Sequence, residues 1–267
     1  MDGGIRVRPY VRWMTLERER VTDFSRYPFC IPAVRHLHTL AFHEKVTFFI
    51  GENGMGKSTL MEALAVACGC CPEGGGRNFL LSTRDTHSAL HRCLRLEKGP
   101  LPPRDNYFLR AESFYNVATY LEDLDAAPAA APPLMDAYGG PLHARSHGES
   151  FFALLNERLG GEGLYLFDEP EAALSPMRQM AMLTAMHRLT RAGSQLVVAT
   201  HSPILMAYPE SVIYLLDGGG IRQVGYEETD HYRVTRDFLN RYPALLRVLL
   251  EEPAAGRSGE DGGDGKD

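Results

Sequence analysis

The chain has 267 residues, of which 44% are hydrophobic and 23% are charged, as in an ordinary soluble globular protein. This length allows one large α/β domain, or a core domain with a small appendage. The net charge of −6 and the lack of a visible basic patch argue against nucleic-acid binding by the chain alone. No apolar run approaches the roughly 18 residues that cross a bilayer, so we expect no membrane insertion.

The five cysteines are an odd number without paired CxxC spacing, which predicts reduced thiols and a cytoplasmic location. A zinc site is conceivable from Cys68, Cys70, Cys71 and Cys93, with His87 and His91 at helical spacing. Structural zinc sites usually show tighter, paired ligand spacing. We therefore favour buried small side chains near a helix end over a metal site.

Residues 5–45 hold short alternating apolar runs separated by prolines, which predicts edge strands of a small antiparallel sheet. Residues 46–50 form an apolar, β-branched and aromatic run typical of a buried strand, and residues 60–67 are good helix formers. The glycine-rich stretch between them has two glycines bracketing four residues and then Lys-Ser. It consists of Gly51, Glu52, Asn53, Gly54, Met55, Gly56, Lys57, Ser58 and Thr59.

This spacing is that of a phosphate-binding loop. Its glycines let successive backbone N–H groups converge on one point, and the following helix adds its positive end. Lys57 would reach the β- and γ-phosphates of a nucleoside triphosphate, and the Ser58 hydroxyl would hold Mg²⁺. The strand before the loop and the helix after it favour this interpretation over an ordinary surface loop. Tyr27 or Phe29 could stack on the adenine ring, although an aromatic residue at such a position more often belongs to the core.

A second buried strand is predicted at 106–111, with Glu112 standing at its end. Residues 113–124 are helix-like, and residues 125–133 form an Ala/Pro linker of low complexity.

Residues 164–170 place two adjacent acids, Asp168 and Glu169, directly after four apolar residues. This pattern predicts a buried strand with its carboxylates at the C-terminal edge of a parallel sheet, where ligands bind. Asp168 would hold Mg²⁺, usually through water, and Glu169 would orient and activate the attacking water. An acid pair at a strand end can also simply cap the next helix, but the phosphate loop upstream favours the catalytic role.

The remaining elements alternate between helix and strand. We predict a helix at 177–192, a strand at 195–203 that carries His201 at its end, and a further strand at 212–216 followed by a turn at 217–220. His201 could be a structural residue, but the chain order places it at the same edge as the acid pair, where a donor to the γ-phosphate is useful. Residues 235–252 predict a closing helix pair broken by Pro243.

With these motifs in order, the chain resembles the ABC-type ATPases, a class that includes the heads of transporters, of SMC proteins and of the Rad50/SbcC repair proteins. The family's signature loop has a counterpart in Ser146-His147-Gly148-Glu149, about 22 residues before Asp168, with a predicted helix at 150–159 after it. The resemblance implies that Ser146 and Gly148 bind the γ-phosphate of ATP held by a second subunit. It therefore implies a head-to-tail homodimer around ATP and Mg²⁺.

Three departures from the family pattern stand out. His147 replaces the first glycine of the signature, and the loop after the acid pair, Ala173-Leu174-Ser175-Pro176, replaces Ser-Ala-Leu-Asp. Glu112 stands where the family has a glutamine at the entry to its helical subdomain, and we count it as a candidate metal ligand. The stretch from Glu169 to Pro176 is similar to short stand-alone bacterial AAA family ATPases with ABC-type heads.

The resemblance implies an α/β P-loop NTPase fold, with a mostly parallel sheet flanked by helices, an N-terminal antiparallel β part and a small helical subdomain at about 113–160. We expect one ATPase domain over residues 1–252 and a disordered acidic, glycine-rich tail over residues 253–267. The 90 or so residues between Lys57 and Ser146 contain no sustained heptads, which argues against an SMC-like coiled coil.

The expected activity is ATP hydrolysis, with Lys57, Glu169 and His201 as catalytic residues. Two alternatives stay open: a nucleotide-dependent switch in DNA double-strand break repair or phage defence, acting with nucleic acid or a partner protein, and the ATPase subunit of a transporter.

Overall fold

The computed structural model describes residues 9–76, 88–126, 134–138, 140 and 147–250. The chain divides into two compact units, residues 1–226 and residues 227–267, which are described separately.

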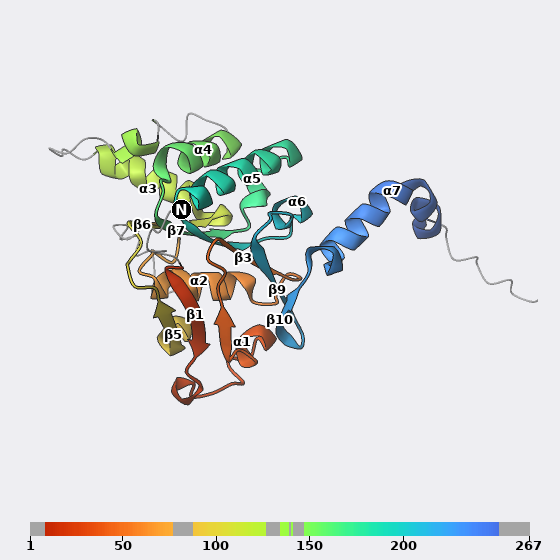
Figure 1. Cartoon of the computed structure of the whole chain (residues 1–267), viewed down its shortest axis with the longest axis horizontal. Helices are drawn as coiled ribbons and strands as arrows, with labels where there is room; N and C mark the ends of the chain where they lie inside the picture. The colour runs from red at the N-terminus through yellow and green to blue at the C-terminus, as the bar shows by residue number, and fades with distance from the viewer. Residues whose placement is uncertain (1–8, 77–87, 127–133, 139, 141–146, 251–267) are drawn as a thin grey trace, which may run out of the picture. The chain divides into compact units, whose positions relative to one another are not determined.

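A seven-stranded sheet forms the centre of the first unit (Figure 1). Its strands, in spatial order, are β10 (Gly220–Val224), β9 (Ser211–Asp217), β3 (Val46–Ile50), β8 (Gln195–Ala199), β7 (Gly163–Asp168), β6 (Asp105–Arg110) and β4 (Gly75–Gly76). The five strands from β9 to β6 are parallel, and antiparallel partners close both edges. Every residue of β3, β7 and β8 is buried, because both faces of a parallel sheet are covered. The predicted α/β fold with a mostly parallel sheet is confirmed.

A separate three-stranded antiparallel sheet has the order β2-β1-β5. Its strands are β1 (Val11–Leu16), β2 (Thr39–Ala41) and β5 (Leu94–Lys98). The antiparallel part predicted for the N-terminal region is therefore confirmed. The histidines at 87 and 91 have helical spacing, but the described residues of this segment do not form an α-helix. They form a 3₁₀ turn, Ala89–Cys93, that leads into β5. Pairing of β5 with β1 along Met14–Leu96 and Leu16–Leu94 overrides the local pattern.

Helices cover both faces of the large sheet. They are α1 (Pro32–Arg35), α2 (Lys57–Ala67), α3 (Phe114–Ala126), α4 (His147–Ala153), α5 (Pro176–Arg191) and α6 (Pro203–Met206). The helices predicted at 60–67, 113–124 and 177–192 are present. The helix predicted at 150–159 is also present, but it changes from α4 to π-type winding over Leu154–Arg158.

Two apolar cores lie on opposite faces of the large sheet. Side chains that alternate along each strand point to opposite faces, so Phe48 and Phe167 belong to the core with α3, α4 and α5, whereas Phe49 and Leu166 belong to the core with α2 and the small sheet. Figure 1 shows α3, α4 and α5 gathered on one face and α2 with β1 and β5 on the other. This sandwich leaves the C-terminal ends of the parallel strands to carry polar groups.

The second unit contains α7 (Asp230–Leu250), in which no residue is buried. Arg241 has non-helical angles (φ −132°, ψ 19°) two residues before Pro243, so α7 is two helical pieces joined at a kink, as the proline predicts. Within the described part of the chain, no helix is long and apolar enough to cross a membrane. The tail predicted to be disordered, residues 253–267, lies outside the described residues.

Candidate functional site

The loop between β3 and α2 has a backbone that only glycine adopts easily. Gly51, Gly54 and Gly56 have φ values of 141°, 81° and 95°. A Cβ on Gly51 would lie 2.2 Å from the carbonyl oxygen of Leu216, and one on Gly56 would lie 2.7 Å from Ile31 Cγ2. A Cβ on Gly54 would have no neighbour within 4 Å, so that side of the loop is open to a ligand. The loop leads directly into α2, whose N-terminal N–H groups favour an anion.

Lys57 is the first residue of α2 and is 4% exposed. Its Nζ donates to the carbonyl oxygens of Gly51 at 2.9 Å and Glu52 at 3.1 Å. Burial lowers the pKa of Lys57, and the nearby carboxylates of Glu169 and Asp168 oppose that effect. The loop thus holds a buried cation whose present acceptors are two backbone carbonyls, which phosphate oxygens can replace.

The acid pair and the phosphate loop, 110 residues apart in the chain, meet at this edge. Ser58 Oγ donates to Asp168 Oδ1 at 3.2 Å, and Asp168 is 3% exposed. Burial raises the pKa of Asp168 from 3.8 to about 6, while Arg110 and the bond from Ser58 act in the opposite direction. A serine hydroxyl beside a carboxylate with a raised pKa is a pair of oxygen ligands of the kind that Mg²⁺ binds, and a cation there would favour the ionised acid.

Arg110 is a member of this cluster that the sequence analysis missed. It ends β6 directly opposite Asp168 in the parallel register, and its Nε lies 3.7 Å from Asp168 Oδ2. Its Nη1 lies 3.3 Å from Glu62 Oε2 of α2. Its Nη2 lies 3.9 Å from Glu112 Oε2, and the Glu112 side chain is 82% exposed. Arg110 is therefore the charged neighbour of Asp168 in this structure, and Glu112 as a metal ligand stays a prediction.

Glu169 and His201 face each other across neighbouring strands. His201 Nε2 lies 3.5 Å from Glu169 Oε1. Glu169 has a left-handed backbone (φ 51°, ψ 50°), fixed by a bond from its N–H to Ala199 O at 2.9 Å. Such a conformation costs a non-glycine residue about 1 kcal/mol or more and is most common at functional sites.

Glu171 is a second residue that the sequence analysis missed. Its Oε1 accepts the backbone N–H of His201 at 2.5 Å, and so it ties the end of β8 to the turn after the acid pair. No signal in the sequence distinguishes Glu171 from a helix-cap acid, because the contact depends on β7 and β8 being neighbours.

The two candidate adenine-stacking residues differ clearly. Phe29 is 8% exposed and packs edge-on against Phe24 in the core. Tyr27 is 67% exposed, and its hydroxyl lies 3.4 Å from Thr59 Oγ1 at the start of α2. Only Tyr27 is therefore open to a base beside the phosphate loop.

The signature stretch is described in part. Ser146 lies outside the described residues, and α4 begins at the next residue, His147. Gly148 is buried in the first turn of α4, and Glu149 is exposed.

Cys68, Cys70, Cys71 and Cys93 are buried, and His87 lies outside the described residues. Among the residues that are described, no three His, Cys, Asp or Glu side chains gather closely enough to hold a metal ion.

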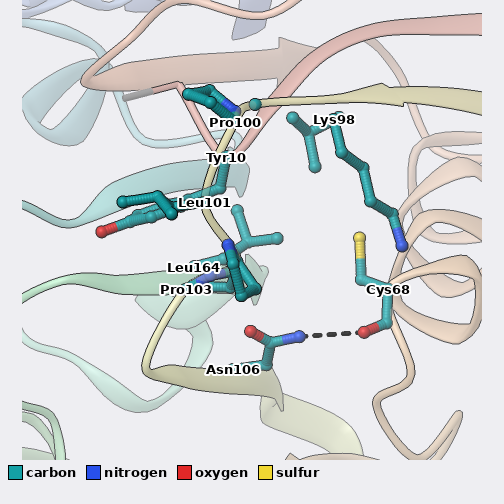
Figure 2. Close-up of a pocket in the computed structure, with 11 residues that line it drawn as sticks. Tyr10, Cys68, Lys98, Pro100, Leu101, Pro103, Asn106 and Leu164 are labelled. Atoms are coloured by element: carbon teal, nitrogen blue, oxygen red, sulfur yellow. Dashed lines mark hydrogen bonds between the residues drawn. The ribbon is translucent and has the colours of Figure 1, made fainter. Parts of the chain in front are cut away.

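A pocket of about 210 Å³ lies at the opposite, N-terminal edge of the parallel strands. Figure 2 shows Lys98 reaching toward Cys68, and Asn106 donating to the carbonyl oxygen of Cys68 at 2.9 Å. Prolines of the loop before β6 and Leu164 of β7 make up much of the remaining wall, so its lining differs from the charged edge described above.

Both halves of this site lie in segments that match known protein families. Residues 28–96, which contain the phosphate loop, match the family described as "AAA domain". Residues 150–207, which contain the acid pair and His201, match "AAA domain, putative AbiEii toxin, Type IV TA system". A "Putative ABC transporter ATP-binding protein" of Geobacter sulfurreducens is 31% identical over 200 residues, which are 67% of this chain and 67% of that protein. The chain belongs to the ABC-type ATP-binding family of P-loop ATPases.

Two further matches of this ABC-type ATPase are a longer protein and a solved structure of lower sequence identity. The macrolide export ATP-binding/permease protein MacB of Neisseria meningitidis is 28% identical over 191 residues, which are 63% of this chain and 28% of MacB. The solved structure of cbiO1 from Clostridium perfringens, part of the ABC transporter complex cbiONQ, aligns with a TM-score of 0.43 and 15% identity. That alignment covers 80% of this chain and 90% of cbiO1.

Proposed function

We propose that this ABC-type protein hydrolyses ATP with Mg²⁺ at the C-terminal edge of its parallel sheet. The observation that carries the proposal is the 3.2 Å contact between Ser58 and Asp168, beside the buried cation of Lys57. Lys57 and the loop amides bind the phosphates, and Ser58 and Asp168 hold the metal. When bound, Mg²⁺ supplies charge neutralisation to the β- and γ-phosphates.

Glu169 is the proposed general base. Its carboxylate lies close enough to Lys57 to oppose the lowering of that lysine's pKa by burial. There it accepts a hydrogen bond from the attacking water, and His201 contacts the γ-phosphate. Glu171 keeps the backbone of His201 in place. Tyr27 stacks on the adenine ring.

The site is completed by a second copy of the chain. Family membership supports a head-to-tail dimer in which Ser146 and Gly148 of one subunit meet ATP held by the other. In the single chain the guanidinium of Arg110 lies beside the Asp168 carboxylate, and we expect Mg²⁺ to replace it there when the nucleotide binds.

The test is Glu169→Gln, assayed for hydrolysis and by size-exclusion chromatography with ATP and Mg²⁺. We expect hydrolysis to fall by about 100-fold or more, because the base is lost, while an ATP-bound dimer accumulates. Glu162→Gln is the matched control, because Glu162 precedes the same strand at its other end and its carboxylate pairs with Arg104 at the surface. Turnover of Glu169→Gln at the wild-type rate would exclude Glu169 as the base.

A second candidate function is the ATP-binding subunit of a transporter. The relative at 31% identity carries that description, and this observation supports a transport role. The trapped Glu169→Gln form, purified from its native host, should then retain a membrane protein. Stimulation of hydrolysis by duplex DNA, with a steep salt dependence, would instead favour the DNA-linked alternative.

A further inference from the structure

Arg178 lies directly against the signature helix. It stands in the first turn of α5, three residues after the serine that caps that helix. Its Nη1 is 1.7 Å from where a Cβ on Gly148 would lie, and its Cζ is 2.9 Å from that point. A Cβ at Gly148 would require the guanidinium of Arg178 to move aside, so the absence of a side chain there leaves room for the guanidinium against α4.

The guanidinium of Arg178 lacks a protein acceptor within the described part of the chain. Among the residues that the structure describes, it makes no hydrogen bond and no ion pair, although it is half-buried. An arginine in the first turn of a helix also opposes the helix dipole. A guanidinium whose donors meet no described protein acceptor can offer them, in its fork geometry, to the oxygens of a phosphate from outside the chain.

The position of Arg178 links the two halves of the proposed site. The helix that it touches, α4, packs against the 3₁₀ turn Pro170–Ala173 that follows Glu169. Arg178, the first turn of α4 and the turn that follows Glu169 therefore lie close together.

We propose that Arg178 contacts the γ-phosphate of ATP bound to the second copy of the chain. This inference rests on the proposed function and adds a catalytic residue to it. The guanidinium donates hydrogen bonds to the phosphoryl oxygens while the γ-phosphorus forms a bond to the water oxygen, its bond to the ADP oxygen breaks, and Glu169 takes the water proton. The guanidinium exchanges no proton and forms no covalent bond.

Arg178→Met tests the role of the charge, because methionine keeps an apolar stem against Gly148 but has no donor. We expect hydrolysis to fall by about 100-fold, with a smaller loss in Arg178→Lys, which keeps a cation. Both should melt near the wild-type temperature. Arg191→Met, at the exposed other end of the same helix, is the matched control and should hydrolyse at the wild-type rate. Wild-type hydrolysis by Arg178→Met would overturn the proposal, and so would equal loss in the Met and Lys variants.

Mixing two weakened variants tests whether Arg178 acts across the dimer. An Arg178→Met subunit keeps its own Glu169, and a Glu169→Gln subunit keeps its own Arg178. Their mixed dimer contains one complete site if Arg178 acts in trans, so the mixture should recover up to about a quarter of wild-type hydrolysis. Lys57→Ala mixed with Glu169→Gln should recover nothing, because both residues act on the nucleotide of their own subunit.

The two proposals fail in different ways. No recovery in the Arg178→Met mixture, while wild-type protein hydrolyses ATP and Glu169→Gln forms the ATP-bound dimer, would overturn the role of Arg178 alone. Absence of hydrolysis and of the ATP-bound dimer in the parent proteins would overturn both.

Discussion

The two ends of strands β6 and β7 differ in chemistry, although they belong to one sheet. At their C-terminal ends, Arg110 and Asp168 lie 3.7 Å apart and face the phosphate loop. At their N-terminal ends, Asn106 and Leu164 line a pocket with prolines and a single lysine, Lys98. Parallel strands bring all of their C-terminal ends to one edge, and helix α2 begins at that edge with its positive end toward the loop. The comparison teaches that the polarity of the sheet, more than the presence of a lysine beside a cavity, decides where a phosphate can bind.

The largest difference between the two edges is expected when the lysine at each edge is replaced by alanine. Lys57→Ala removes the buried cation at the loop, so we expect ATP affinity to fall by about 100-fold or more. Lys98→Ala removes an exposed lysine at the opposite edge and should leave ATP affinity unchanged. Equilibrium titration with a fluorescent ATP analogue measures both. Retained affinity in Lys57→Ala would count against the phosphate loop.

The two aspartates at opposite ends of the sheet should separate function from stability. Asp168→Asn removes the carboxylate that would hold Mg²⁺, and we expect hydrolysis to fall by about 100-fold. Burial raises the pKa of Asp168 from 3.8 to about 6. At pH 7.5 the carboxylate is therefore ionised in the fold, where its charge is less stable than in the unfolded chain, so the neutral variant should melt at or above the wild-type temperature.

Asp105→Asn is the counterpart at the start of β6. Asp105 accepts two hydrogen bonds from Arg158, at 2.7 and 3.1 Å. Its loss should cost about 1–2 kcal/mol of unfolding free energy, or a melting temperature lower by about 2–6 °C, with the rate per folded molecule unchanged. Calorimetry and a hydrolysis assay on the same samples separate the two outcomes. If the Asp168→Asn variant hydrolysed ATP at the wild-type rate, that result would contradict the role of Asp168 as a metal ligand.

A smaller effect is expected from the exposed aromatic residues. Tyr27→Ala should weaken ATP binding about fivefold, because one stacking contact is worth about 1 kcal/mol or more. Trp13→Ala removes an aromatic residue that is 44% exposed on β1, remote from the loop in the chain, and should change nothing. Titration with ATP and with inorganic triphosphate separates base stacking from phosphate binding: only the affinity for ATP should change in Tyr27→Ala.

The sequence predicted the parts of this site that depend on local pattern. The loop from Gly51 to Thr59 has fixed spacing, and the run before Asp168 is apolar without alternation, so both strands and their polar ends could be placed. Arg110, Glu171 and Arg178 could not be found in this way. Each acts through a neighbour set by strand order or helix packing: Asp168 across β6 and β7, His201 across β7 and β8, and Gly148 across α4 and α5. The strand β5 was missed for the same reason, since only its pairing with β1 makes it a strand.

The most direct measurement is a crystal structure of the Glu169→Gln variant grown with ATP and Mg²⁺. We predict Mg²⁺ within about 2.1 Å of Ser58 Oγ, Lys57 Nζ on the β- and γ-phosphates, and the triphosphate between the phosphate loop and Asp168. Nucleotide bound instead beside Lys98, or at the loop with Ser58 and Asp168 far from the metal, would contradict the site proposed for this edge of the sheet.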